Sequence, residues 1–363
     1  MTPRTLVQSH VMEQTVKPQG KRVYVGLSGG VDSATVAALL QKEGYAVTGV
    51  FIQGWYPPGL RCTWASDRRD AMRVAAHLRI PFLTLDASKE YKKAVIDYLL
   101  REYGAGRTPN PDIMCNKEVK FGAFYNFAMS KGADFIATGH YARTRGDAGG
   151  VHLLRGVDTE KDQSYFLWAV SREALSKTLF PLGGYKKSEV RTLAKQWHLP
   201  VAEKKDSQGI CFLGNVSIED FLKDTSTTTP GDACDETGAK VGVHRGSVLY
   251  TLGERIALSE ATTSGPWYVV AKNMRDNTVV VSKTRSTKQG SPITFILEDT
   301  SFIQTPPQDS TAQYRYHCEE VRGTYDQETH LFTPHTPLIE PIASGQSLVL
   351  YDGEECLGGG IIV

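Results

Sequence analysis

The sequence predicts an α/β protein with an N-terminal domain built on a parallel sheet, a small central domain and a β-rich, barrel-like C-terminal domain. Three observations lead to this prediction. The chain of 363 residues is longer than one hydrophobic core usually organises. Its first half alternates apolar strand patterns with helical patterns. From residue 242 onward, short β patterns with turn residues take over.

The N-terminal elements follow one another in a regular order. Strands are predicted at Val23–Leu27, Ala46–Trp55, Phe82–Asp86 and Ala133–Ala142. Helices are predicted at Ala34–Glu43, which Gly44 ends, and at Asp70–Leu78 and Lys89–Gly104. Strands separated by helices of this length predict a parallel sheet covered on both faces.

The remaining elements are mostly hairpins. One is predicted over Pro266–Lys283 and another over Ser347–Val363, turned at Asp352 and Gly353. We therefore expect four segments: a flexible N-terminal tail over residues 1–20, an α/β domain over 21–213, a central module over 214–284 and a barrel-like domain over 285–363.

Composition and charge exclude several classes of protein. With 40% hydrophobic and 22% charged residues, the chain is typical of soluble globular proteins, and no apolar run reaches the roughly 18 residues that span a bilayer. Six cysteines without a C-x-x-C pair argue against a disulfide scaffold and favour a reducing cytoplasm. The net charge is only +1, but residues 117–205 hold 15 Lys and Arg against 9 Asp and Glu. That local excess leaves room for a phosphate-binding surface.

The segment "VYVGLSGGVDSATVAALL" joins the first strand to the first helix. Such a loop presents free backbone N–H groups and the positive end of a helix to an anion. Ser28 and Ser33 add hydroxyl donors, whereas the carboxylate of Asp32 repels phosphate unless a metal ion intervenes. No Lys precedes the Ser, so this is not a Walker A motif, and it is not G-x-G-x-x-G. The alternative reading is a plain strand-to-helix turn.

The segment "TPNPDIMCNKEVKFGAF" combines a stiff turn with a helical pattern. Pro109 and Pro111 stiffen the turn, and apolar residues then recur at helical spacing. We therefore expect Cys115 at or just before a helix N-terminus, where the dipole favours a thiolate. A buried, inert cysteine is the alternative. Asp112 favours a site, as an acid/base partner.

Two further residues have ordinary explanations when they are taken alone. Cys211 begins an apolar run and is typical of a core residue, and His140 follows a strand, as core or capping histidines do. No His, Cys and Asp cluster has transition-metal spacing, so we expect no protein-held zinc.

Several long motifs together resemble one family. "SGGVDS" resembles the PP-loop of the ATP pyrophosphatase superfamily, whose fold is adenine nucleotide alpha hydrolase-like. The segments "AGRTPNPDIMCNKEVKFGAF", "ATGHYAR", "KDQSYFLWAV", "KKDSQGICFLG", "PWYVVAK" and "CLGGGII" narrow the resemblance to the tRNA-specific 2-thiouridylase family, from about Lys21 to the C-terminus.

This resemblance implies an ATP- and Mg²⁺-dependent cytoplasmic tRNA sulfurtransferase, with a PP-loop ATP pyrophosphatase domain for catalysis over residues 21–213 and a central module over 214–284 that contacts tRNA. It adenylates O2 of the wobble uridine and then delivers sulfur from a persulfide on Cys211, which a sulfur-relay or desulfurase donor protein supplies. Cys115 resolves the persulfide by forming a disulfide bond, and Asp112 moves protons. The implied ATP-binding residues are Gly26, Leu27, Ser28, Gly29, Gly30, Val31, Asp32, Ser33, Ile52 and Gly139. The implied contacts with tRNA or its target base are Asn110, Pro111, Asp112, His140, Lys161, Asp162, Gln163, Arg315, Tyr316 and Gln346.

Three alternatives remain open at this point. A PP-loop ligase or amidotransferase acting on a small molecule needs neither paired cysteines nor a β-rich RNA-holding domain. A non-catalytic tRNA-binding protein does not need "SGGVDS". An iron–sulfur-dependent tRNA thiolase keeps the chemistry but uses three of the six cysteines to hold a cluster.

Overall fold

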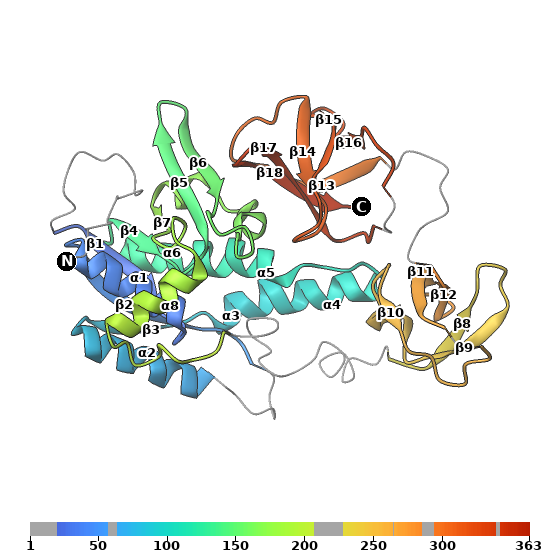
Figure 1. The fold of residues 1–363 in the computed structure, drawn as a ribbon, viewed down its shortest axis with the longest axis horizontal. Coiled ribbons are helices and arrows are strands. Elements are labelled where there is room, and N and C mark those ends of the chain that lie inside the picture. The colour runs from blue at the N-terminus through green and yellow to red at the C-terminus, as the bar shows by residue number, and fades with distance from the viewer. Residues whose placement is uncertain (1–19, 57–63, 207–227, 264, 285–293, 339–341) are drawn as a thin grey trace, which may run out of the picture. The chain divides into compact units, whose positions relative to one another are not determined.

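The structure is a computed structural model that describes residues 20–56, 64–206, 228–263, 265–284, 294–338 and 342–363 (Figure 1). Its internal contacts divide the chain into two compact units. The described residues of the first unit come from Met1–Ser88, Asn116–Ser207 and Glu354–Cys356. Those of the second come from Lys89–Cys115, Gln208–Gly353 and Leu357–Val363.

The first unit is built on a five-stranded parallel sheet in the order β3-β2-β1-β4-β7, which confirms the predicted sheet. The strand order reverses at β1, because β2 lies on one side of it and β4 on the other. In sheets of this kind, ligands bind at the carboxyl ends of the strands beside such a reversal. The strands are β1 (Arg22–Gly26), β2 (Ala46–Gln53), β3 (Phe82–Asp86), β4 (Phe135–Ala137) and β7 (Thr178–Leu179).

Helices cover this sheet. The side chains of α1 are almost all buried, and they share a hydrophobic core with α2 and α8. The alanine-rich sequence of α1 permits this close packing, since small side chains let neighbouring elements approach. The helices of this unit are α1 (Val31–Lys42), α2 (Trp64–Leu78), α6 (Phe124–Ser130), the 3₁₀ turn η3 (Ser164–Leu167), α7 (Arg172–Ser176) and α8 (Lys187–Gln196).

A hairpin of β5 (Ala142–Asp147) and β6 (Gly150–Arg155), which the sequence did not predict, stands out from the sheet (Figure 1). His152 lies between two carboxylates, with Nε2 2.9 Å from Asp147 Oδ2 and Nδ1 2.6 Å from Glu355 Oε1. Burial opposes the charge of this ring, but the two carboxylates raise the pKa of His152 above its usual value.

The second unit begins with a helical stretch that confirms the helix predicted over residues 89–104. It consists of α3 (Ser88–Tyr91), a π-helical turn η1 (Lys92–Ile96) and α4 (Asp97–Gly104). After a loop, α5 (Pro111–Met114) runs on into the π-helix η2 (Cys115–Ala123).

Two β modules complete the second unit, and both predicted hairpins are present in them. The central module has the strand order β10-β11-β12-β8-β9 around a small core. In the C-terminal module β13, β16, β15, β14, β17 and β18 follow one another, and a β13–β18 pairing closes them into a six-stranded antiparallel barrel within the described residues. The central strands are β8 (Gly231–Cys234), β9 (Lys240–His244), β10 (Arg255–Ile256), β11 (Trp267–Asn273) and β12 (Thr278–Ser282), with the 3₁₀ turn η4 at Ser247–Leu249. The barrel strands are β13 (Phe295–Phe302), β14 (Asp309–Gln313), β15 (Val321–Asp326), β16 (Leu331–Pro334), β17 (Ser347–Asp352) and β18 (Glu355–Ile362).

Candidate functional site

The glycine-rich loop between β1 and α1 is held in shape by its own serines. Ser28 Oγ lies 3.2 Å from Ser33 Oγ and accepts a hydrogen bond from the Gly30 N–H at 3.3 Å. Gly29 has φ +78°, and a Cβ there would lie 2.3 Å from the carbonyl oxygen of Asp67, so only glycine fits. No side chain caps the first turn of α1, which leaves the positive helix end to a ligand.

The predicted ATP-binding residues gather at the carboxyl ends of the central strands. Gly139, just after β4, has so little space that a Cβ there would lie 3.1 Å from both Asp32 Cβ and the Ser33 amide nitrogen. Ile52 lies on the neighbouring strand β2, with Cδ1 3.8 Å from the place of a Cβ on Gly26. The structure therefore brings the loop, Ile52 and Gly139 together.

Asp32 is paired with a lysine that sequence reasoning missed. Lys187 Nζ lies 2.7 Å from each carboxylate oxygen of Asp32 and 3.0 Å from Asp206 Oδ1. The Tyr141 hydroxyl donates to Asp32 Oδ1 at 2.9 Å. Burial, and after it the Asp32 charge, raises the pKa of Tyr141, so the hydroxyl stays a donor. A basic side chain thus offsets the carboxylate that stands among the hydrogen-bond donors of the loop.

A second lysine, Lys204, also contacts the loop. Lys204 Nζ donates to the Gly29 carbonyl oxygen at 3.1 Å and to carboxylate oxygens of Asp67 and Asp70 at 2.8 Å each. Burial opposes its charge, but the hydrogen bonds with the two carboxylates raise the pKa of Lys204. The loop therefore contacts two ammonium groups, Lys187 at Asp32 and Lys204 at Gly29.

One sequence signal for Lys187 existed. Lys186 and Lys187 stand at the N-cap and the first position of α8, where the helix dipole disfavours cations. A lysine in that position is stabilised when a carboxylate from another part of the chain lies beside it, as Asp32 does here. Lys204 belongs to the quoted segment "KKDSQGICFLG" but carries no comparable local signal.

His140 is buried and has a neighbour at each ring nitrogen. Nδ1 lies 2.7 Å from Thr138 Oγ1, and Nε2 lies 3.5 Å from Lys120 Nζ. Burial, and then the charge of Lys120, lowers the pKa of His140 well below its usual value. These surroundings are those of a neutral core histidine, and contact with tRNA stays a prediction.

The three predicted tRNA residues at 161–163 differ in exposure. Asp162 is buried and accepts hydrogen bonds from the backbone N–H groups of Gly156 and Ser164, at 2.9 and 3.1 Å. Gln163 Oε1 accepts from the Tyr141 N–H at 3.0 Å. Lys161 is exposed. Asp162 and Gln163 therefore shape the turn, and Lys161 is the one of the three that faces solvent.

The expected position of Cys115 in its helix is wrong. Asn110 is the N-cap, its Oδ1 accepts from the Asp112 N–H at 3.2 Å, and Pro111 fills the first helical position. The buried Cys115 begins the second turn, and its own N–H already donates to the carbonyls of Pro111 and Asp112. Asparagine followed by proline is the stronger start signal, so the helix begins earlier than the apolar spacing indicated.

The remaining predicted residues of the second unit lie in turns of the C-terminal barrel. Arg315 is exposed, and the ring of Tyr316 stacks on that of His317 with centroids 3.9 Å apart. Gln346 Nε2 donates to the Thr108 carbonyl oxygen at 2.7 Å. Cys211 lies outside the described residues, so its predicted pairing with Cys115 stays a prediction.

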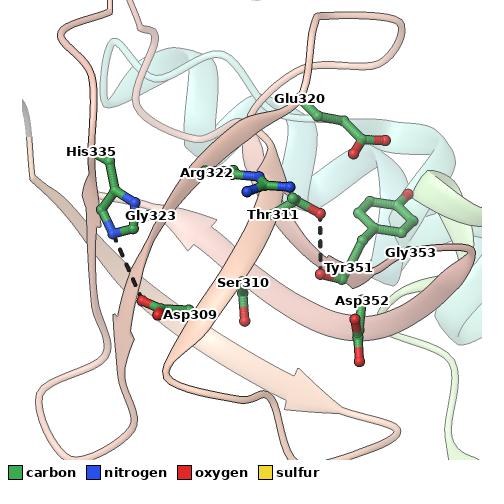
Figure 2. Close-up of a pocket in the computed structure, with 10 residues that line it drawn as sticks. All are labelled: Asp309, Ser310, Thr311, Glu320, Arg322, Gly323, His335, Tyr351, Asp352 and Gly353. Atoms are coloured by element: carbon green, nitrogen blue, oxygen red, sulfur yellow. Dashed lines mark hydrogen bonds and ion pairs between the residues drawn. The ribbon is translucent and has the colours of Figure 1, made fainter.

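A separate hollow of about 430 Å³ lies on the C-terminal barrel (Figure 2). Its charged lining consists of Asp309, Glu320 and Asp352 together with Arg322 and His335. His335 Nε2 stands 3.8 Å from Asp309 Oδ1. Carboxylates outnumber the basic groups there, whereas basic groups predominate in sites for RNA phosphates. We assign this hollow no part in the reaction.

Two absences apply to the described part of the chain. No helix there is both long and apolar enough to cross a membrane. Nor do three or more His, Cys, Asp or Glu side chains gather there into a metal-holding group.

Comparisons with known families match the chain almost throughout. A family model described as "tRNA methyl transferase HUP domain" matches residues 21–215. Models described as "tRNA methyl transferase PRC-barrel domain" and "Aminomethyltransferase beta-barrel domain" match residues 219–283 and 292–362.

Curated relatives are similar over nearly their full length. The chain is 42% identical over 353 residues to "tRNA-specific 2-thiouridylase MnmA" of Staphylococcus carnosus, covering 95% of each chain. It is 43% identical to the relative of the same name from Oceanobacillus iheyensis, covering 94% of each. Two of the model descriptions mention tRNA methyl transfer, whereas the curated relatives, which cover 94–95% of this chain, are named for thiolation. Among solved structures, NMN synthetase from Francisella tularensis shows 20% identity and a TM-score of 0.35, covering 57% of this chain and 73% of that one.

Proposed function

The chain belongs to the tRNA-specific 2-thiouridylase family, and from that premise we propose that it thiolates C2 of the wobble uridine of tRNA in two chemical steps. Activation by ATP comes first, because the carbonyl-type O2 of uracil is a poor leaving group. Sulfur transfer follows. The observation that best supports the proposal is the glycine-rich loop at the strand-order reversal, flanked by Lys187 and Lys204.

In the activation step, uridine O2 forms a bond to the α-phosphorus of ATP, and the bond from that phosphorus to the β-phosphate oxygen breaks. Diphosphate leaves. Backbone N–H groups of the loop and the uncapped first turn of α1 bind the phosphates. The carboxylate of Asp32 is a ligand type that magnesium favours, so Asp32 would hold a magnesium ion that accompanies ATP, and that ion would offset phosphate charge. Before ATP binds, the ammonium group of Lys187 neutralises the charge of Asp32.

In the transfer step, the outer sulfur of a Cys211 persulfide attacks C2 of the activated base. The bond between C2 and the adenylated oxygen breaks, and AMP leaves with that oxygen. The Cys115 thiolate then attacks the inner sulfur of Cys211, which releases the outer sulfur onto uridine and leaves a disulfide. Asp112, on the first turn of the same helix as Cys115, is the proposed proton carrier.

The proposed tRNA contacts follow from exposure and charge. Lys161 and Arg315 are the exposed residues among those predicted to contact tRNA, and the half-buried Tyr316 ring is proposed to stack on a base. Asn110, Pro111 and Asp112 are proposed for the target base, which has to leave the anticodon loop stack.

The function is tested with purified protein, unmodified tRNA, ATP, magnesium and a persulfide donor protein. We expect 2-thiouridine in the nucleoside mass spectrum and one diphosphate per thiolated base. Asp32→Ala should abolish diphosphate release and leave tRNA binding near its original strength. Diphosphate release without thiouridine, on a small amide or acid substrate, would favour the ligase alternative. An anaerobic absorption spectrum distinguishes the iron–sulfur alternative.

A further inference from the structure

Thr108, in the loop before Asn110, is held from both sides of its peptide group. Its N–H donates to the Ser344 carbonyl oxygen at 2.8 Å, and its own carbonyl oxygen accepts from Gln346 Nε2 at 2.7 Å. Gly345 stands between these partners with φ +88°, and a Cβ there would lie 3.0 Å from the Thr108 nitrogen. The close approach therefore requires a glycine between the two residues that bind Thr108.

The turn that holds Thr108 is itself fixed to the C-terminal barrel. The Gly345 N–H donates to the Ile362 carbonyl oxygen at 2.7 Å, and the Ile362 N–H donates to the Gln346 carbonyl oxygen at 2.8 Å. Arg107 adds a second attachment, because its Nη1 lies 3.1 Å from Glu298 Oε1 on strand β13. Two neighbouring residues of the loop are thus bonded to the barrel.

The chain between Thr108 and the proposed site is short and stiff. Pro109 and Pro111 fix φ at two of the next three residues. Asn110 between them is the N-cap of α5, and its Oδ1 accepts a hydrogen bond from the Asp112 N–H. A displacement of Thr108 therefore moves Asp112 and the helix behind it, because few backbone torsions remain to absorb the change.

We propose that Gln346 is a positioning residue, which holds Thr108 and thereby keeps Asn110, Asp112 and Cys115 in place for sulfur transfer. This inference rests on the proposed function for its catalytic consequence only. The hold on the loop follows from the hydrogen bonds alone.

The test uses Gln346→Met, which keeps the length of the side chain and removes the N–H donor. The control is Gln327→Met in the same barrel, because Gln327 Nε2 makes a hydrogen bond of the same kind, 2.9 Å from the Pro306 carbonyl oxygen. Hydrogen–deuterium exchange of peptides spanning residues 105–115 should accelerate about fivefold in Gln346→Met, as expected for one lost hydrogen bond, and stay unchanged in the control.

Kinetics provide the second measurement. We expect kcat for thiolation at saturating tRNA to fall at least about fivefold in Gln346→Met, because the residue acts through the loop. A raised Kd with unchanged kcat, or unchanged exchange, would overturn the proposal, as would faster exchange with unchanged kcat. Exchange needs no turnover, so a failure of the unaltered protein to form 2-thiouridine would count against the proposed function alone.

Discussion

Removal of the Lys187 ammonium group gives the sharpest test of the nucleotide site. Lys187→Ala takes away a cation that lies 2.7 Å from both Asp32 oxygens and 3.0 Å from Asp206. Its side chain is only 13% exposed, so water replaces it poorly. The change leaves two carboxylates beside the place where phosphates are expected.

The size of the effect follows from charge and exposure. A unit charge about 4 Å away is worth up to about 4 kcal/mol at the surface of a protein. Asp32 and Asp206 are 31% and 41% exposed, so solvent and salt reduce this value. We expect a loss of about 2 kcal/mol in ATP binding, which is about 30-fold in Kd.

The assay is calorimetric titration with ATP and magnesium. Lys195→Ala is the matched control on the same helix, because Lys195 is 57% exposed and pairs only with the exposed Glu203 among the described residues. A double-mutant cycle with Asp32→Asn sharpens the result. Because the two groups compensate each other, their losses should not add. An unchanged Kd in Lys187→Ala, or fully additive losses, would refute the role given to Lys187.

Three further predictions concern RNA, sulfur and pH. Charge reversal at Lys161 or Arg315 should weaken tRNA binding in filter-binding assays, and the salt dependence of log Kd should become less steep; at Arg315 the ATP affinity should stay unchanged, and a salt-independent Kd for tRNA would contradict the prediction. Cys211→Ser should form no protein persulfide in mass spectra, whereas Cys115→Ser should form one and fail to release it; full thiolation by either variant would rule out the two-cysteine mechanism. For His152 the folded-state pKa is raised, so its stabilisation is complete below the unfolded pKa near 6.5 and is lost as pH rises through the folded value. The melting temperature of His152→Gln should therefore differ from that of the unaltered protein most at pH 5.5 and least at pH 9. A difference that stays constant with pH would contradict the stabilisation of charged His152 by Asp147 and Glu355.

Local patterns predicted most of the fold. The strands at 22–26 and 82–86, the helix at 89–104 and the hairpins at 267–282 and 347–362 all follow from apolar periodicity and turn residues within one short window. The β5–β6 hairpin was missed, because "ARTRGD" is largely polar and its partner strand supplies the packing. Strand signals of this kind depend on neighbours more than on sequence.

The site was predictable only where its chemistry is local. The loop "SGGVDS" can be recognised in the sequence from its glycines and from its place between a predicted strand and a predicted helix. Lys187 lies 155 residues from Asp32, and Gln346 lies 238 residues from Thr108. No pattern in a single sequence pairs residues so far apart, since the pairing depends on how the sheet and the barrel return the chain. The position predicted for Cys115 was wrong for a different reason. The helix start was inferred from the spacing of apolar residues, whereas the helix begins at the Asn110–Pro111 start signal.

The charges around the loop indicate why a carboxylate stands among phosphate donors. The side chains joined there are four carboxylates and four basic groups: Asp32, Asp67, Asp70, Asp206, Lys187, Lys204, Arg73 and Arg191. Lys187 and Lys204 are both paired with carboxylates, and the charges of the network cancel. A phosphate ester without a metal ion therefore gains little binding energy from these lysines. Asp32 would be the ligand for a divalent cation that accompanies ATP, and Lys187 would then be available to the phosphates. A tRNA backbone phosphate brings no such tightly held ion. We therefore expect Asp32 to weaken the binding of free phosphate and of RNA phosphates at this loop, so that the loop binds the nucleotide. RNA phosphates should instead bind at Lys161 and Arg315.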